Sequence, residues 1–294
     1  MHLLSVPQKI FRVFNYVFLV LITILCLVPV MNLLAISMSS SAAISAGKVS
    51  LWPVEFTLEP YKYAINNPKF VTAALVSLKR VFLGVVIPIL FAIILAYPLS
   101  KDKEVFKKRN VYANILLTSM LIGGGLIPGY VMLSNIKLLD TIWALVLPGA
   151  INAYAIILLQ NFYRGIPKEL EEAAFIDGAS VWKTLWRVYI PLSKPVMATL
   201  ILFQVVGHWN AWFDGLIYMN RIENYPLQTY LHTLIIQDTM LLNVSAQDMA
   251  TMIKLTQRNL NSAQVFIAMI PVLLFYPFVQ KYFTTGIIIG SVKG

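Results

Sequence analysis

Six long apolar runs, each close to the length of a membrane-spanning helix, set the main limit on what this chain can fold into. The chain is 59% hydrophobic and only 12% charged, whereas soluble domains carry about 25% charged residues. About 20 mainly apolar residues cross the hydrocarbon core, and a lone crossing segment must be helical to satisfy its own backbone. The sequence therefore predicts an all-α membrane protein, a single transmembrane domain over residues 1–294. Its helices are expected at about 11–36, 71–98, 111–133, 141–163, 195–217 and 263–283.

The positive charges predict which side of the membrane each loop faces. The segments 101–109 and 164–194 are short, and each holds five Lys or Arg. The Lys and Arg residues expected on the opposite side are spread over the longer segments 37–80 and 218–262. Short loops rich in Lys and Arg stay in the cytoplasm, so we expect both of these segments and both termini to be cytoplasmic. The net charge of +10 is not gathered into one basic face, which argues against nucleic acid as a partner.

The charged segment 164–194 is too polar to lie in the hydrocarbon and must project from the membrane or rest on its surface. Its pattern predicts a short helix with acidic residues in its first turn, ended by Gly178, and a second helix capped by Ser180. In the second helix Trp182, Trp186 and Tyr189 fall at i, i+4 and i+7, which predicts one aromatic face at the membrane interface. An ordinary cytoplasmic loop that happens to be helical is the alternative.

The same segment carries an ordered motif. Glu172-Ala173-Ala174 is followed after three residues by Gly178, and nine residues later by Val188, Ile190 and Pro191. This spacing resembles the EAA motif of bacterial ABC importer permeases, with Val188 and Ile190 as mild apolar departures from the usual isoleucine and leucine. The resemblance implies a coupling helix seated in a cleft of an ATPase. The residues that it assigns to this contact are Glu171, Glu172, Ala173, Ala174, Phe175, Asp177 and Gly178.

Further stretches resemble the maltose-type (MalG-like) carbohydrate permeases, particularly a branch linked to complex oligosaccharides. They are LWPVEFTLEPYKY (51–63), GGGLIPGY (123–130), LLDTIWALVLPGA (138–150), HWNAWFDGLIY (208–218), YPLQTYL (225–231) and GIIIGSVKG (286–294). The resemblance implies a type I ABC importer permease in the bacterial cell (inner) membrane. Its expected partners are a second, related permease, two ATP-binding subunits, an extracellular solute-binding protein and membrane lipid.

No catalytic or cofactor motif accompanies these stretches. The sequence lacks a G-x-x-x-x-G-K-[ST] phosphate loop, an H-E-x-x-H pair and a G-x-S-x-G turn. We therefore expect no enzymatic activity, no metal and no directly bound cofactor, with ATP used by the partner subunits.

Polar residues within the apolar runs are the candidates for a substrate path, because such groups usually face a cavity. Sugar recognition needs flat aromatic faces and planar amide or carboxylate partners, and the fifth run supplies both. The candidates are Gln204, Trp209, Asn210, Trp212 and Asp214, with Asn152 in the fourth run as a weaker one. The alternatives are that the tryptophans anchor the chain at the membrane interface and that Asp214 is held in a structural salt bridge.

A self-sufficient carrier driven by an ion gradient is the competing function. It would need a relay of buried ionisable groups across the spans. Asp214 and the pair Lys79–Arg80 are the candidates, and they are too few to favour such a relay.

Overall fold

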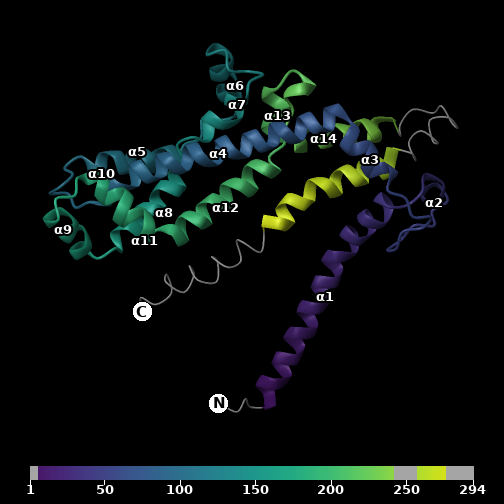
Figure 1. Ribbon diagram of the computed structural model, residues 1–294, viewed down its shortest axis with the longest axis horizontal. Coiled ribbons are helices and arrows are strands. Elements are labelled where there is room, and N and C mark those ends of the chain that lie inside the picture. The colour runs from purple at the N-terminus through teal and green to yellow at the C-terminus, as the bar shows by residue number, and fades with distance from the viewer. Residues whose placement is uncertain (1–5, 242–256, 276–294) are drawn as a thin grey trace. The chain divides into compact units, whose positions relative to one another are not determined.

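The computed structural model describes residues 6–241 and 257–275, and every regular element in these two ranges is a helix (Figure 1). The described part of the chain therefore confirms the all-α prediction. Residues 1–70 with 231–270 form one compact unit, and residues 71–230 with 271–294 form a second. The two are described separately below. That the whole chain is one transmembrane domain stays a prediction, and both termini lie outside the described residues.

The first unit contains α1 (Val6–Ser37), α2 (Ser41–Ser45), α3 (Glu59–Asn66) and, up to Ile270, most of a helix over Gln257–Phe275. Asn259 of the last helix donates to the carbonyl of Ser39 and, at 3.1 Å, to the Ser41 hydroxyl. Ser37 and Tyr61 share a hydrogen bond of 2.6 Å, which joins the end of α1 to α3. The polar groups at the end of α1 are thus paired within the unit, as backbone and hydroxyl groups away from water must be.

The second unit is built on the long helix α4 (Pro68–Ser100). The helices that follow it are α5 (Arg109–Leu121), α6 (Leu126–Asn135), α7 (Ile142–Val146), η1 (Leu147–Gly149), α8 (Ala153–Arg164), α9 (Lys168–Ile176), α10 (Val181–Thr184), η2 (Leu185–Tyr189), α11 (Ile190–Leu192), α12 (Lys194–Asn210), α13 (Phe213–Tyr218) and η3 (Ile222–Asn224). The last helix of this region, α14 (Leu227–Leu241), continues into the first unit.

The candidate membrane spans match the six predicted runs in number. Three single helices are long and apolar enough to cross, namely α1, α4 and Gln257–Phe275. Three bent pairs pass the same test together, which gives up to six spans: α5 with α6, α7–η1 with α8, and α10–α11 with α12. The predicted sixth run extends to residue 283, so its last part lies outside the described residues.

Two predicted spans differ from the structure in their course. The third run breaks into α5 and α6, which are bent by 112°, where Gly125 takes a φ of +83° that glycine adopts without strain. The fifth run was predicted to continue to residue 217, but α12 ends at Asn210. The carbonyl of Ala211 accepts a hydrogen bond of 3.1 Å from Arg80, so the chain leaves the helix where an arginine satisfies its backbone.

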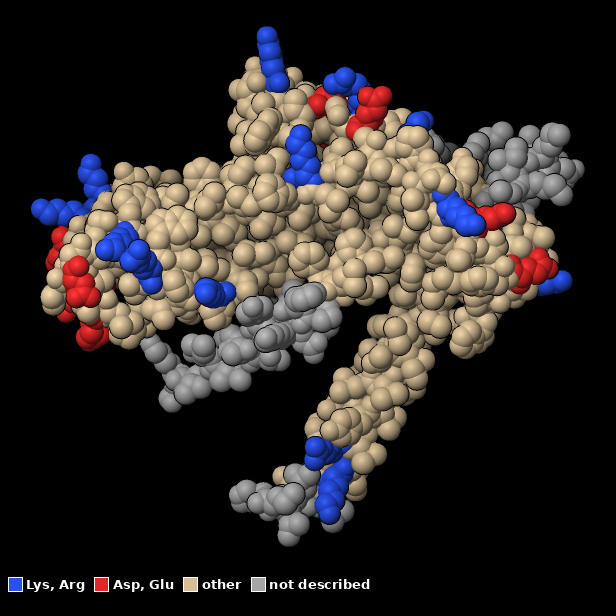
Figure 2. All heavy atoms as spheres, in the orientation of Figure 1, with Lys and Arg blue, Asp and Glu red and all other residues tan. Residues whose placement is uncertain are grey.

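The core of the second unit lies where α4, α8, η2 and α12 meet. Its buried centre includes Ala92, Ile156, Leu159, Leu185 and Leu200. Farther along α4, a Cβ on Gly84 would collide with the His208 imidazole of α12, so the absence of a side chain lets these helices approach closely. On the face shown in Figure 2, the charged side chains of this unit gather at the end that carries α9 and α10 and around α6 and α13, with few between.

A carboxylate organises the loops around α6 and α13. Asp140 accepts hydrogen bonds from the backbone N–H groups of Asn220 and Arg221, from the Arg221 guanidinium at 2.6 Å and from the Asn224 amide at 2.9 Å. Burial acts to raise the pKa of Asp140, but these hydrogen bonds outweigh it and lower the pKa to about 2. The loops therefore depend on an ionised Asp140.

This dependence predicts a pH effect. A carboxyl whose pKa is lower in the folded chain contributes stability above its ordinary pKa and loses that contribution as the pH falls. We expect Asp140→Asn to lower the melting temperature of the detergent-solubilised chain at neutral pH. The difference from the native chain should shrink between about pH 4 and about pH 2. A difference that stays constant over this range would show that the charge of Asp140 is not what stabilises these loops.

Candidate functional site

Helix α9 forms the first half of the charged segment 164–194 and has no fully buried residue. Leu170 and Phe175 are nearly half exposed and Ile176 is 87% exposed, an unusual display of large apolar side chains on a polar segment. Gly178 ends the helix with a φ of +75°, and the Ala179 N–H returns to the carbonyl of Ala174 at 2.9 Å. The predicted glycine stop is confirmed, and α9 leaves large apolar side chains exposed.

The second half begins as predicted and then departs from the prediction. Ser180 caps α10 by accepting from the Lys183 N–H. The chain then widens into the π-helical turn η2, which ends two residues before Pro191, a residue that has no N–H to donate. A π turn places side chains at a smaller angular step than an α-helix does. Trp182 and Trp186 are accordingly more than half exposed, whereas Tyr189 is 4% exposed. The prediction of one aromatic face is wrong for Tyr189.

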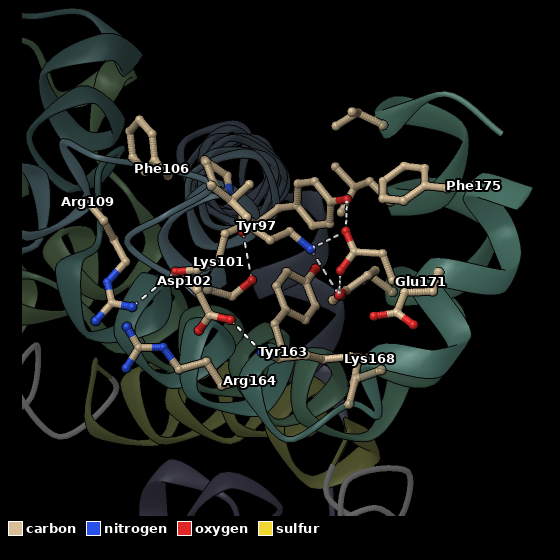
Figure 3. Close-up of a pocket in the computed structure, with 18 of the residues that line it drawn as sticks. Tyr97, Lys101, Asp102, Phe106, Arg109, Tyr163, Arg164, Lys168, Glu171 and Phe175 are labelled. Atoms are coloured by element: carbon tan, nitrogen blue, oxygen red, sulfur yellow. Dashed lines mark hydrogen bonds and ion pairs between the residues drawn. The ribbon is translucent and has the colours of Figure 1, made fainter. Parts of the chain in front are cut away.

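A buried ion pair fastens α9 to the end of α4. Lys101 directly follows α4, and its ammonium lies 2.6 Å from Oε1 of Glu171 on α9. The hydroxyls of Tyr97 and Tyr189 donate to the same carboxylate at 2.9 and 2.7 Å, and Lys101 donates to the Tyr189 hydroxyl at 3.0 Å (Figure 3). We call these four residues, Tyr97, Lys101, Glu171 and Tyr189, the polar clasp.

Aromatic rings enclose the polar clasp. The Lys101 ammonium lies 3.9 Å from the centroid of the Tyr97 ring and 4.4 Å from that of Tyr189, both within cation–π range. Tyr189 also meets the rings of Tyr97 and Tyr163 edge to face at 4.9 and 5.2 Å. The pair is therefore shielded from water, and the side chains of Lys101 and Glu171 are 13% and 16% exposed.

The pKa values of the pair reflect this burial. Burial lowers the pKa of Lys101, although the ion pair with Glu171 acts in the opposite direction. Burial also acts to raise the pKa of Glu171, but hydrogen bonds from Lys101 and Tyr189 outweigh it and hold that pKa below its ordinary value. Glu171 is therefore a charged carboxylate near neutral pH, and it compensates the ammonium that the fold buries.

The polar clasp lies in the wall of a cavity of about 880 Å³ that is lined by α9, the end of α4, the end of α8 and the start of α10. Lys168 at the start of α9 pairs with Asp102 at 2.5 Å, a second and more exposed link to the loop after α4. The helix α9 is thus held from one side by two ion pairs, and its apolar outer side chains are left uncovered by the described part of this unit.

The resemblance to the EAA motif assigned Glu171 to the outer contact surface together with Glu172. The structure separates the two residues, because Glu171 points into the clasp and Glu172 is exposed. Sequence reasoning missed Tyr97 and Lys101 as functional candidates. The available signal was their i, i+4 spacing at the end of a span, but nothing in it identified an acidic partner 70 positions away.

The substrate-path candidates fall on and after α12. Gln204 and Asp214 are half-buried, Asn210 is exposed, Trp209 is buried and the Trp212 ring packs edge to face on Phe213 at 5.6 Å. Asn152 lies before α8, where its side chain caps the helix by accepting from the Ala155 N–H at 2.9 Å. The structure thus gives Asn152 a structural role and brings Asp214 into a charged group with Arg80 and His208. A part in sugar contact stays a prediction for all six residues.

Asp214 pairs with Arg80, whose side chain is 2% exposed. The two Nη atoms of Arg80 donate to the two carboxylate oxygens, and Nε lies 3.5 Å from Nδ1 of His208. This is the structural salt bridge that the sequence left open as an alternative, and it ties the start of α13 to α4.

Removing the carboxylate should therefore destabilise the chain. We expect Asp214→Ala to cost about 3 kcal/mol, because a buried guanidinium loses its only ion-pair partner among the described residues. The measurement is the melting temperature in detergent, with Glu223→Ala, an exposed acid in the following loop, as the matched control. Loss of transport with an unchanged melting temperature would instead identify Asp214 as a substrate contact.

A helical chain with up to six membrane spans and a projecting helix–turn–helix held by one largely buried and one exposed ion pair has the features of an integral membrane permease. The chain belongs to the family of binding-protein-dependent transport system inner-membrane components, whose model matches residues 4–289. This match confirms the resemblance drawn from the motifs.

Individual relatives agree with the family over nearly the full chain. The chain is 39% identical over 288 residues to Protein LplC of Bacillus subtilis (strain 168), covering 97% of this chain and 96% of the relative. It is 32% identical to the polygalacturonan/rhamnogalacturonan transport system permease protein YtcP of the same organism, covering 98% and 99%. Among solved structures, a chain of a bacterial ABC transporter involved in the import of the acidic polysaccharide alginate superposes with a TM-score of 0.87 at 32% identity, covering 96% and 100%.

Proposed function

We propose that this chain is a pore-forming subunit of an ATP-driven importer for carbohydrate, with an oligosaccharide as its substrate. The permease YtcP and the alginate transporter are both named for polysaccharide transport, and both align with nearly the whole chain. Support for the substrate class comes from these relatives. It does not come from the residues around α12.

The proposed mechanism assigns ATP hydrolysis to two separate subunits and the coupling to α9. The single observation that carries it is the two-sided character of α9, which exposes Leu170 and Ile176 away from the cavity while Glu171 is held in the polar clasp inside it. An ATPase subunit that closes when it binds ATP would bind the exposed side of α9 and displace this helix. The polar clasp would then pass the displacement to α4 through Lys101 and to the bent pair α10–α12 through Tyr189. The spans would in this way alternate between outward-open and inward-open states.

The proposed assembly also contains a second permease and an external solute-binding protein that delivers the substrate. The chain would lie in the bacterial cell membrane with both termini in the cytoplasm, since its short basic loops 101–109 and 164–194 face that side. The chain itself would bind no cofactor.

The test is a mild-detergent pull-down of the chain from its native membrane, followed by mass spectrometry of the retained proteins. We expect a phosphate-loop ATPase and a second permease to be recovered. Recovery of this chain alone from otherwise intact complexes would contradict the proposal. Uptake that collapses with an ionophore while ATP is maintained would then favour the ion-gradient carrier.

A further inference from the structure

Two arginines stand in the cavity wall apart from the polar clasp. Arg109 is the first residue of α5 and Arg164 is the last residue of α8. Arg109 Nη1 donates to the carbonyl of Lys101 at 3.0 Å, and Arg164 Nη2 donates to the carbonyl of Leu99 at 3.2 Å. Figure 3 shows both guanidinium groups on the same side of the cavity, beyond Asp102. The backbone at the end of α4 thus holds two positive groups together.

Neither arginine has a carboxylate within ion-pair distance among residues 6–241 and 257–275. Of the carboxylates in the wall, Glu171 pairs with Lys101 and Asp102 pairs with Lys168. Asp102 also attracts both arginines electrostatically without forming an ion pair with either. Nε of Arg109 is buried without a hydrogen-bond partner in the same described part. The two guanidinium charges also repel each other. Arg109 therefore has a buried unused donor beside a second, exposed cation. Because buried donors are normally satisfied, this arrangement favours an anion.

The position of the arginines indicates where that anion comes from. They lie where α4 ends and α5 begins and where α8 ends, which are the ends of three candidate spans. Ends of spans lie at the level of the lipid headgroups. The same cavity has an apolar wall that includes Ile94 on α4 and Val105 and Phe106 in the following loop. A pair of cations beside an apolar wall, at the level of the headgroups, is complementary to a phospholipid, which joins a phosphate to acyl chains.

We propose that Arg109 and Arg164 bind the phosphate of an anionic phospholipid from the cytoplasmic leaflet, with an acyl chain lying along Ile94 and Phe106. Planar guanidinium groups bind phosphate oxygens through paired hydrogen bonds, and basic pockets on the cytoplasmic side of membrane helices bind anionic headgroups. The lipid neutralises a charge pair beside α9. This inference concerns a lipid site on the chain and holds whatever substrate the importer carries.

The experiment uses the full chain, purified in mild detergent with the subunits that it retains, and native mass spectrometry with phosphatidylglycerol or phosphatidylcholine added. We expect retention of phosphatidylglycerol to exceed that of phosphatidylcholine by roughly 30-fold, as two interfacial cations would give. The double variant Arg109→Gln/Arg164→Gln should abolish this preference. The matched control is Lys107→Gln/Lys108→Gln, which removes the same charge from exposed positions of the same loop and should keep it.

Two further measurements decide the outcome. Phosphatidylglycerol with a photoreactive acyl chain should label the native chain in the peptides around residues 94–109 and 164–168, a result that does not depend on any variant folding. Labelling confined to other spans would overturn the proposal, and so would an equal loss of preference in the lysine control. Inorganic phosphate that raises the melting temperature as much as phosphatidylglycerol does would also overturn it, by assigning the site to a soluble anion.

Discussion

Reversing the charge of Glu171 with Glu171→Lys should reduce ATP-dependent uptake by more than tenfold. The variant would place two ammonium groups in a site where the side chains are 13% and 16% exposed, and breaking a buried pair costs about 3 kcal/mol. We expect α9 to detach from the end of α4, so that ATP hydrolysis continues while transport falls. The measurement is the ratio of substrate uptake to ATP hydrolysis in membrane vesicles.

Two further variants separate coupling from folding. Glu169→Lys makes the same charge change at an exposed position of α9 and should leave the ratio close to that of the native chain. The exchange Lys101→Glu/Glu171→Lys restores a pair of opposite charges at the same two positions, and we expect it to recover part of the uptake. If the exchanged pair transports no better than Glu171→Lys alone while the chain is present at normal levels, the clasp does not transmit motion.

Replacing Gly178 by valine should have the second-largest effect. Gly178 has a φ of +75°, and a Cβ built there meets no atom within 4 Å. A side chain at this position would therefore destabilise the turn through backbone strain and not through steric contact within the described part of the chain. A left-handed conformation costs an ordinary residue about 1–2 kcal/mol, and a β-branched residue tolerates it least. We expect Gly178→Val to open the turn between α9 and α10 and to lower uptake by roughly tenfold.

Asparagine is the informative comparison, because it adopts this conformation far more readily than valine does. Gly178→Asn should retain most of the uptake with the chain at the same level in the membrane. Equal loss with both residues would mean that the space beside Gly178 matters and that a partner fills it. Equal retention with both would show that the turn is not needed for coupling.

The elements that the sequence predicts well depend on local signals. The apolar runs predict α1 and α4 within a few residues, because burial in lipid needs only length and hydropathy. The turn at Gly178 and the cap at Ser180 follow from the conformational preferences of single residues. The family assignment also depends on such a local pattern, the spacing from Glu172 to Pro191.

Features made by distant residues could not be predicted in the same way. The polar clasp joins residues 70 and 88 positions apart, and one sequence shows no pairing between them. The π turn that buries Tyr189 and the early end of α12 at Asn210 both depend on tertiary contacts, with the aromatic cluster and with Arg80 respectively. The sequence therefore placed Glu171 in the motif without predicting that its carboxylate is held inside the cavity.

The polar clasp also bears on the order in which the chain is made. Lys101 leaves the ribosome 70 residues before Glu171 and 88 before Tyr189. At a synthesis rate of about 5–20 residues per second, Glu171 is made roughly 4–14 s after Lys101. During this interval α5 to α8 are synthesised, since they precede α9 in the chain. The ion pair that holds α9 against the end of α4 can therefore form only after the segments of those four helices have been made.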